Sequence, residues 1–285
     1  MYSFFLTLIG LIWLTPVTAA PLLEVRVEAG ERLQDWCGRL QAADLFTCDD
    51  LFRLAQEADF SNYSLVPPAA PPIDPNRPFI GNRFEGLLRP GAYRMPRPAA
   101  ASSYERARTI LDTLLKTSQA ALAALSPVLG LNVRQQIILA SIVEKEGVEG
   151  HNLPRIATVF HNRLARNDRL GSCPAVEYAL GFHRPFLLHR DLEAVADSPY
   201  NLYHQAGLPP TPICFFSDRA LQAVRAPRAD SLVYFFVYDW AEGKHYFAPI
   251  DDLAGHRANA ERAKANYRAR HGDIRRLFPG KFYRP

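Results

Sequence analysis

Residues 132–147 read Asn-Val-Arg-Gln-Gln-Ile-Ile-Leu-Ala-Ser-Ile-Val-Glu-Lys-Glu-Gly, and this stretch decides the fold. Its middle is apolar, and its two ends carry the signals of a helix. Asn132 is a residue type that caps helix N-termini, and Gly147 is one that ends helices. The stretch therefore predicts a helix with both ends marked.

The two glutamates near the end of this helix are expected in different surroundings. At roughly 100° per residue, one stripe of the helix is apolar. That stripe is formed by Ile138, Leu139, Ile142 and Val143. Glu146 lies at its centre and Glu144 on the opposite side. Because desolvation disfavours a carboxylate, Glu146 is expected to be protonated near neutral pH, as a general acid must be. The alternative is a solvated residue at the end of a helix that leaves the core.

The other expected elements are short and of both kinds, which predicts an α+β fold. A strand is expected at 25–29 and helices at 31–40, 51–58, about 104–125 and about 153–165. A β-hairpin is expected from 233–238 and 244–247, followed by a basic terminal helix. Residues 66–78 are rich in proline, which removes backbone donors and fixes φ, so this segment is a loop or linker.

Composition limits the class of protein. With 48% apolar and 22% charged residues, the chain is neither disordered nor a polytopic membrane protein. Its 285 residues suit one ordinary domain and a smaller one. The net charge of +4 is concentrated in the run 261–270. Such a run favours nucleic acid, anionic lipid or an anionic polymer, or is only the solvated face of a terminal helix, which is its usual meaning.

The first 22 residues predict a signal peptide or a membrane anchor. No charged side chain occurs before Glu24, and residues 4–14 are almost wholly apolar. That length suits a signal-peptide core better than a full span, which needs roughly 20 residues. Small residues at 17–20 resemble a cleavage site, but the segment lacks Lys and Arg. A buried strand would also account for the apolar run.

Four cysteines in a chain that reaches an oxidising compartment predict disulfides. Proximity favours Cys37 with Cys48, which leaves Cys173 with Cys214, although the sequence allows three pairings. A zinc site has no supporting CxxC or HExxH spacing, and the histidines share no metal spacing. Neither a metal nor another cofactor is expected.

Several collinear motifs resemble one known family. They are 84–86 (Phe-Glu-Gly), 138–146 (Ile-Leu-Ala-Ser-Ile-Val-Glu-Lys-Glu), 158–164 (Thr-Val-Phe-His-Asn-Arg-Leu), 198–203 (Ser-Pro-Tyr-Asn-Leu-Tyr), 207–210 (Gly-Leu-Pro-Pro) and 234–237 (Tyr-Phe-Phe-Val). The chain resembles the MltG family, the YceG-like endolytic murein transglycosylases. The resemblance covers residues from about 24 to the end and implies that the catalytic glutamate is Glu146.

The resemblance also implies an organisation and further site residues. After the leader at 1–22 it implies a small LysM-like unit at 23–95, a lysozyme-like mixed α/β catalytic domain at 96–260 and a basic helix or tail at 261–285. Substrate-binding residues are expected in the matching motifs, namely Asn162, Arg163, Tyr200 and Asn201. The alternative for Asn162 and Arg163 is that they organise the fold beneath the cleft.

One motif departs from the family pattern. Where members often have Gln-x-Asp-Pro, this chain has Gly171-Ser172-Cys173-Pro174, so no role of that aspartate can be carried over. Some members carry cysteines at the positions of Cys173 and Cys214. The resemblance therefore implies a bridge between these two that braces the loops around the cleft.

The implied reaction is lytic cleavage of peptidoglycan between N-acetylmuramic acid and N-acetylglucosamine, which leaves a 1,6-anhydro end. It implies action in the cell envelope, on an inner-membrane anchor facing the periplasm or in the periplasm itself, with cell-wall synthases as partners. A hydrolase would need a second carboxylate, for which Glu177, Asp191 and Glu193 are candidates. A non-catalytic glycan-binding scaffold would keep the same fold. A nucleic-acid binder would explain the basic run, but the leader argues against it.

Overall fold

The computed structural model describes residues 22–70, 72–74, 76–98, 102–150, 152–275 and 278–279. The predicted signal peptide or anchor at 1–22 lies outside these residues, except for Leu22, which begins strand β1. Within the described ranges, no helix combines the length and the apolar character that crossing a membrane requires.

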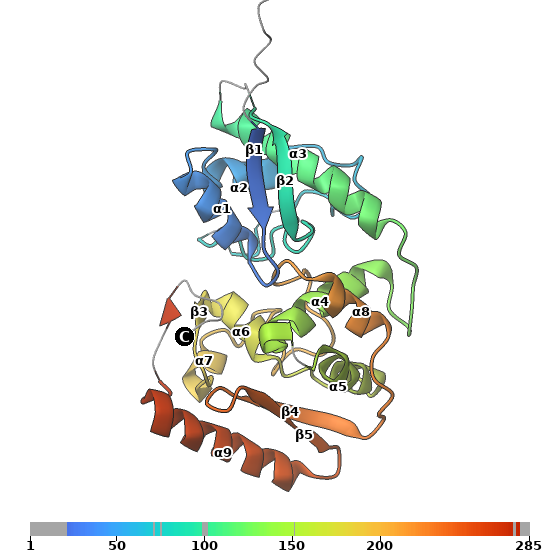
Figure 1. Ribbon diagram of the computed structural model, residues 1–285, viewed down its shortest axis with the longest axis vertical. Helices are drawn as coiled ribbons and strands as arrows, with labels where there is room; N and C mark the ends of the chain where they lie inside the picture. The colour runs from blue at the N-terminus through green and yellow to red at the C-terminus, as the bar shows by residue number, and fades with distance from the viewer. Residues whose placement is uncertain are drawn as a thin grey trace, which may run out of the picture.

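The N-terminal part is a two-stranded antiparallel sheet with two helices between its strands (Figure 1). Its elements are β1 (Leu22–Val27), α1 (Leu33–Ala42), α2 (Cys48–Glu57) and β2 (Gly91–Pro96), and Val25 pairs with Tyr93. Helix α3 (Ser103–Leu122), which falls inside the predicted range 96–260, packs against α2. The described residues of the proline-rich segment lie in a loop between α2 and β2, as expected.

The predicted helix at 132–147 forms as α4 (Val133–Glu146). Asn132 and Gln135 cap each other's backbone N–H groups, and Gly147 follows the last residue. The helix is not amphipathic, however, because Ala140 and Ser141 are as buried as the apolar stripe. Helices α5 (Leu153–Ala165), α6 (Cys173–Leu180) and α8 (Asp218–Arg225) pack around it, so α4 is a central helix rather than a half-exposed one.

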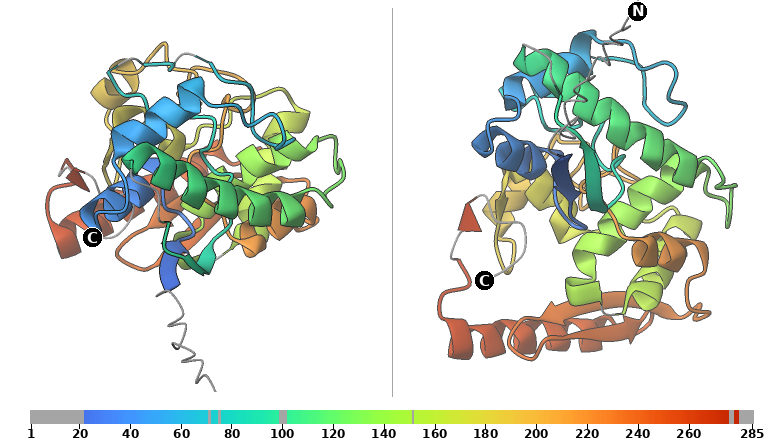
Figure 2. Two further views of the ribbon diagram at one scale, coloured as in Figure 1. Left: turned by 90° about the horizontal axis from the view of Figure 1, so that it is seen from above. Right: turned by 45° about the horizontal axis from the view of Figure 1, so that its top comes forward.

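The C-terminal part adds a layer outside these helices. The predicted hairpin forms from β4 (Val233–Asp239) and β5 (Lys244–Pro249) and lies between α5 and α9 (Leu253–His271) (Figure 1). The right-hand view of Figure 2 shows the same order of layers, with α9 outermost. Short elements complete the described chain: η1 (Val148–Gly150), β3 (Phe182–His183), α7 (His189–Glu193) and β6 (Phe278–Pro279). The mixed α/β character expected from the sequence is confirmed.

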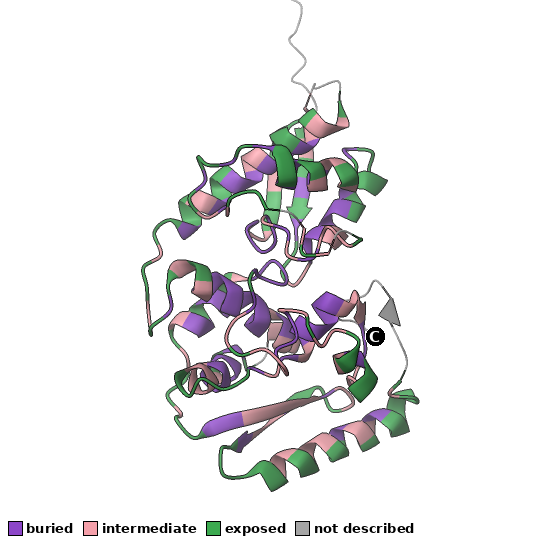
Figure 3. Cartoon of the chain, turned by 180° about the vertical axis from the view of Figure 1, so that it is seen from behind, coloured by how far each residue is buried: buried purple, intermediate pink, exposed green. Residues whose placement is uncertain are grey.

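Burial is greatest in the helices around α4 and least on the outer face of α9 (Figure 3). Only Ala263 and Tyr267 of α9 are buried, and α9 packs on the hairpin. The basic run therefore faces solvent, as expected for the polar face of a terminal helix. Helix α9 also runs across the predicted boundary between 260 and 261.

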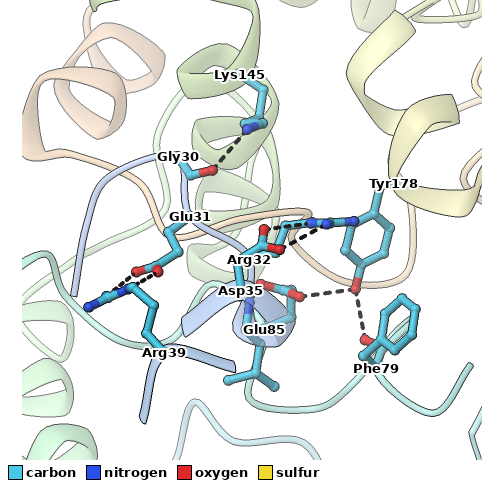
Figure 4. A network of polar contacts seen from close by, with 10 residues as sticks. Gly30, Glu31, Arg32, Asp35, Arg39, Phe79, Glu85, Lys145 and Tyr178 are labelled. Carbon is cyan, nitrogen blue, oxygen red and sulfur yellow. Dashed lines mark hydrogen bonds and ion pairs between the residues drawn. The ribbon is translucent and has the colours of Figure 1, made fainter. Parts of the chain in front are cut away.

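Buried polar contacts join the N-terminal part to α4 and α6 (Figure 4). Lys145 Nζ donates to the Gly30 carbonyl at 2.9 Å. The Glu85 carboxyl accepts from the Leu33 backbone N–H at 2.9 Å and from the Tyr178 hydroxyl at 3.2 Å. Since Lys145 directly precedes Glu146, the N-terminal part is bonded to the end of the helix that carries the candidate acid.

Candidate active site

Glu146 is the last residue of α4, and both its side chain and its backbone carbonyl have a hydrogen-bond partner. Ser172, fully buried, donates its hydroxyl to Glu146 Oε1 at 2.8 Å. On the backbone side, His245 Nε2 of β5 lies 2.9 Å from the Glu146 carbonyl oxygen. Ser172 occupies the N-cap position of α6 but makes no side-chain cap bond there. Its hydroxyl is thus directed to the acid rather than to its own helix.

The surroundings of Glu146 favour its protonated form. Burial of the carboxyl raises its pKa to about 8, and the nearby Glu177 charge acts in the same direction. The Ser172 hydrogen bond and the Arg163 charge oppose this rise in pKa. The residue as a whole keeps part of its surface open to solvent. A protonated carboxyl can act as a general acid at neutral pH.

Glu144 has a structural environment instead. Its carboxylate accepts from the backbone N–H of Ser217 at 2.9 Å and from the Ser217 hydroxyl at 2.6 Å. Ser217 is the N-cap of α8. Glu144 therefore fixes the start of a neighbouring helix, and the two glutamates of α4 are separated as the helical projection predicts.

Asn162 and Arg163 hold the hairpin onto α5. The Asn162 amide donates to the carbonyl of Val233 at 2.8 Å, and Arg163 Nη2 donates to that of Tyr234 at 2.8 Å. Arg163 also donates to the carbonyl of Leu170, in the segment that leads to Ser172. These contacts match the alternative in which the pair organises the fold beneath the cleft.

Tyr200 and Asn201 are fully buried. The Tyr200 hydroxyl pairs with Thr211 Oγ1 at 2.7 Å, and the Asn201 amide donates to the carbonyl of Leu192 at 3.0 Å. Their polar atoms serve the loops around them, so the sugar contacts expected of Tyr200 and Asn201 are not supported. Two proteins can share a sequence motif because a loop depends on its internal hydrogen bonds. The motif alone does not distinguish this structural role from a role in ligand binding.

The cysteines follow one expectation and contradict the other. Cys37 and Cys48 form the expected disulfide, which joins α1 to α2. The prediction of a disulfide between Cys173 and Cys214 is wrong, because both residues are free thiols. Cys173 contacts the Tyr203 hydroxyl at 3.0 Å, beside the Glu146 site, whereas Cys214 donates to the Ser141 carbonyl at 3.3 Å.

The physical reason is the position of α4 between the two thiols. Ser141 precedes Glu146 by five residues, which places the two side chains roughly 140° apart around the helix. Cys173 lies on the Glu146 side and Cys214 on the Ser141 side, so the body of a buried helix separates them.

The described residues offer no metal cluster as an alternative site, and a cavity that they form lies elsewhere. No three His, Cys, Asp or Glu side chains within the described ranges are grouped to hold a metal ion. A cavity of about 210 Å³ lies between α2 and the proline-rich loop, lined by Phe52 and Ile73 among others. Neither Glu146 nor Ser172 lines it, so we place the candidate chemistry at Glu146 on the basis of its contacts.

The sequence profile of the YceG-like family matches residues 13–262, most of the chain. The chain belongs to the YceG-like family. The resemblance read from its motifs is thereby confirmed.

Members of this family with established names match part of the chain. An endolytic murein transglycosylase of Bacillus subtilis is 31% identical over 159 residues, 55% of this chain and 42% of the relative. One of Streptococcus pneumoniae strain D39 is 33% identical over 173 residues, 58% of this chain and 30% of the relative. The match thus spans less than half the length of these relatives.

A solved structure supports the fold of this YceG-like chain. The crystal structure of a YceG-like protein from Listeria monocytogenes has a TM-score of 0.69 and 27% identity. The match covers 85% of this chain and 77% of the chain in that crystal structure. The N-terminal and C-terminal parts described above are therefore largely shared with that protein.

The sequence predicted no role for Ser172, and the histidines share no spacing that would single out His245. Ser172 stands in the one motif that departs from the family pattern, directly before Cys173-Pro174. A serine shortly before a proline is a helix-start signal, which would have placed Ser172 at an N-cap. Nothing in the sequence indicates that its hydroxyl turns to Glu146 instead.

Proposed function

We propose that this chain is a peptidoglycan lytic transglycosylase of the cell envelope, with Glu146 as its single acid/base. The observation that carries the proposal is the Glu146 carboxyl, whose pKa burial raises to about 8 and which Ser172 orients. The relatives from Bacillus subtilis and Streptococcus pneumoniae are named endolytic murein transglycosylases, which supports peptidoglycan as the substrate.

In the proposed reaction, protonated Glu146 donates its proton to the glycosidic oxygen between N-acetylmuramic acid and N-acetylglucosamine as the C1–O bond breaks. The resulting carboxylate accepts the proton of the muramic C6 hydroxyl, whose oxygen bonds to C1. The products are an N-acetylglucosamine end with a free hydroxyl and a 1,6-anhydro end, and Glu146 is protonated again. The sequence of steps balances without water, so one carboxyl serves as acid and then as base.

The candidates for a second carboxylate support this one-carboxyl chemistry. An ordinary glycosidase needs another carboxylate as base or nucleophile. Glu177 and Asp191 are buried, and each is paired, Glu177 with His183 at 2.9 Å and Asp191 with Arg184 at 2.8 Å. Glu193 is exposed on α7. Glu177, whose charge acts on Glu146, is buried and bonded through Oε1 to His183, so it is not placed to activate a water molecule.

The proposal extends to the surroundings of the enzyme. If the N-terminal part is LysM-like, it would bind the glycan strand next to the catalytic region. The buried contacts of Lys145 and Glu85 would then hold the N-terminal part and the catalytic region in a fixed relative position. Action on nascent strands would make cell-wall synthases its partners. The leader at 1–22 would bring the chain to the periplasmic side of the inner membrane, retained or cleaved.

The test is digestion of purified peptidoglycan in heavy-oxygen water by the wild type, Glu146→Gln and the matched control Glu144→Gln. We expect unlabelled anhydro products from the wild type and the control, and a rate lower by about 100- to 10,000-fold for Glu146→Gln. Incorporation of label at the new ends would show a hydrolase. Equal anhydro release by wild type and Glu146→Gln would contradict the proposal, and no release by any of the three proteins would favour a scaffold.

A further inference from the structure

The cavity beside α2 lies where the N-terminal part meets the start of α4. The N-terminal part lines it with Phe52, Ile80 and Asn82, and the part around α4 lines it with Arg134 and Thr211. Junctions between two parts of a chain are common places for ligands to bind. The volume of about 210 Å³ is below the roughly 300–1,000 Å³ of pockets that hold a whole small molecule. The cavity therefore suits the end of a chain.

The walls of this cavity are mostly apolar, and its charged groups are of one sign. Phe52, Ile80 and several prolines form the apolar surface. Its charged residues are Arg83 and Arg134, and none of the described residues that line it is acidic. A sugar needs many hydrogen-bonding side chains for its hydroxyls, and few line this cavity. The walls instead favour an anionic group with small apolar substituents.

Both arginines are held by main-chain carbonyls rather than by carboxylates. Arg134 Nη2 donates to the carbonyl of Pro210 at 2.8 Å. Arg83 Nη2 donates to that of Leu54 at 3.1 Å. In the described part of the chain the charge of Asp59 acts on Arg83, and no carboxylate acts on Arg134. A carbonyl accepts a hydrogen bond but does not neutralise a guanidinium, so Arg134 keeps its charge for a ligand.

A buried amide adds a hydrogen-bond donor to the same cavity. Asn82 is 6% exposed and is one of the lining residues. Its Oδ1 accepts from the Phe84 backbone N–H at 3.0 Å, and its Nδ2 has no hydrogen-bond partner among the described residues. The unused N–H groups of such a side chain can donate to a ligand. Two guanidinium groups and an amide donor are the groups that bind a carboxylate.

The loop that carries the Gly-Leu-Pro-Pro motif connects the cavity to the acid site. At one end of this loop Tyr203 contacts Cys173, next to the serine that bonds Glu146. At the other end Thr211 lines the cavity. Arg134 and Glu146 lie near opposite ends of α4, about 18 Å apart along its axis at 1.5 Å per residue. A ligand that occupies both sites must span a distance of this order.

We propose that this cavity binds the C-terminal carboxylate of the peptide stem that peptidoglycan carries on N-acetylmuramic acid. An extended peptide of five residues spans at most roughly 17 Å, which is close to the separation of the cavity from Glu146. The methyl groups of its alanines suit the apolar walls, and its carboxylate suits Arg134. A stem bound in this way holds its glycan strand at the acid. The inference rests on the proposed function, because it takes peptidoglycan as the substrate.

The experiment is calorimetric titration of the full chain with the pentapeptide L-Ala-γ-D-Glu-L-Lys-D-Ala-D-Ala and with the same peptide amidated at its C-terminus. The wild type should bind the acid roughly tenfold more tightly than the amide, because the amide loses a charged hydrogen bond. Arg134→Gln should lose this preference, and Arg134→Lys should restore part of it. The matched control is Arg257→Gln, an exposed arginine on α9, which should keep the preference.

A second variant repeats the test without changing either arginine. Gln56 of α2 lines the cavity and is exposed. Gln56→Glu keeps the shape of the side chain and adds a negative charge, so affinity for the acid should fall and affinity for the amide should not. In digestion, the wild type should have a lower KM for strands with pentapeptide stems than for strands whose stems an amidase has removed, and Arg134→Gln should lose this difference.

Equal affinity of the wild type for the acid and the amide overturns the inference, as does an unchanged preference in folded Arg134→Gln. Tighter binding of octanoate than of the pentapeptide also overturns it, because the cavity would then be a fatty-acid site. Absence of anhydro products from the wild type would instead overturn the proposed function, while the titration would still test the cavity.

Discussion

At the residue scale, the hydrogen bond from Ser172 to Glu146 favours the ionised carboxylate and opposes the effect of burial. Replacing Ser172 by alanine should raise the pKa of Glu146 further and free its side chain to rotate. We expect kcat to fall roughly tenfold, because the carboxylate formed after proton transfer loses its donor, and the alkaline limb to move to higher pH. Exposed Ser64→Ala is the control. A profile identical to the wild type would show that Ser172 does not orient the acid.

The two free thiols give a second prediction at this scale. Cys173 contacts the Tyr203 hydroxyl and Cys214 contacts the Ser141 carbonyl of α4, so a bridge between the two cysteines would require the core to move. Titration with a thiol reagent in denaturant, without reductant, should therefore find two thiols per chain. Burial raises the pKa of Cys173 to about 12, so the native protein should react slowly. No reactive thiol in denaturant would mean that the bridge implied by the resemblance forms after all.

At the scale of elements, the two glutamates at the end of α4 have different partners. Glu144 bonds the N-cap of α8, where an acceptor satisfies donors that the helix leaves open. Glu144→Ala should lower the free energy of unfolding by about 1–2 kcal/mol in urea titrations. Because Glu144 does not contact Glu146, kcat should stay close to that of the wild type.

The comparison with Glu146→Gln makes this prediction specific. That variant should lose activity without losing stability, the reverse of Glu144→Ala. If Glu144→Ala lost activity in proportion to Glu146→Gln while remaining folded, the assignment of the acid to Glu146 alone would be wrong.

At the scale of the whole molecule, the buried junction should make stability depend on pH. Burial raises the pKa of Glu85 to about 8, as it does for Glu146. In the unfolded chain these carboxyls ionise near 4.5, whereas in the folded chain they keep their protons. The folded state then binds more protons, so stability falls as the pH rises from about 4.5 to about 8.

Glu85→Gln removes one of these two groups. The decrease in unfolding free energy between pH 5.5 and 7.5 should become shallower, by on the order of 1 kcal/mol per pH unit. Urea unfolding at three pH values measures it, with exposed Glu57→Gln on α2 as the control. The same slope in wild type and Glu85→Gln would mean that Glu85 is not protonated in the folded junction.

Local features were predictable because their causes act within a few residues. The caps at Asn132 and Gly147 marked the ends of α4, and the helical period separated Glu146 from Glu144. The hairpin followed from its strand pattern, and the Cys37–Cys48 bond from proximity along the chain. Packing on every side of α4 also buries Ala140 and Ser141, which lie off the apolar stripe.

Only the tertiary structure decided the partners of the acid. Ser172 reaches Glu146 across 26 residues of sequence, and Lys145 reaches Gly30 across 115. Such contacts depend on how the whole core packs, and no local period or cap encodes them. For the same reason the sequence could not show that Tyr200 and Asn201 are buried, or that α4 lies between Cys173 and Cys214. The sequence by itself predicted which glutamate is the candidate acid, and the fold determined what surrounds it.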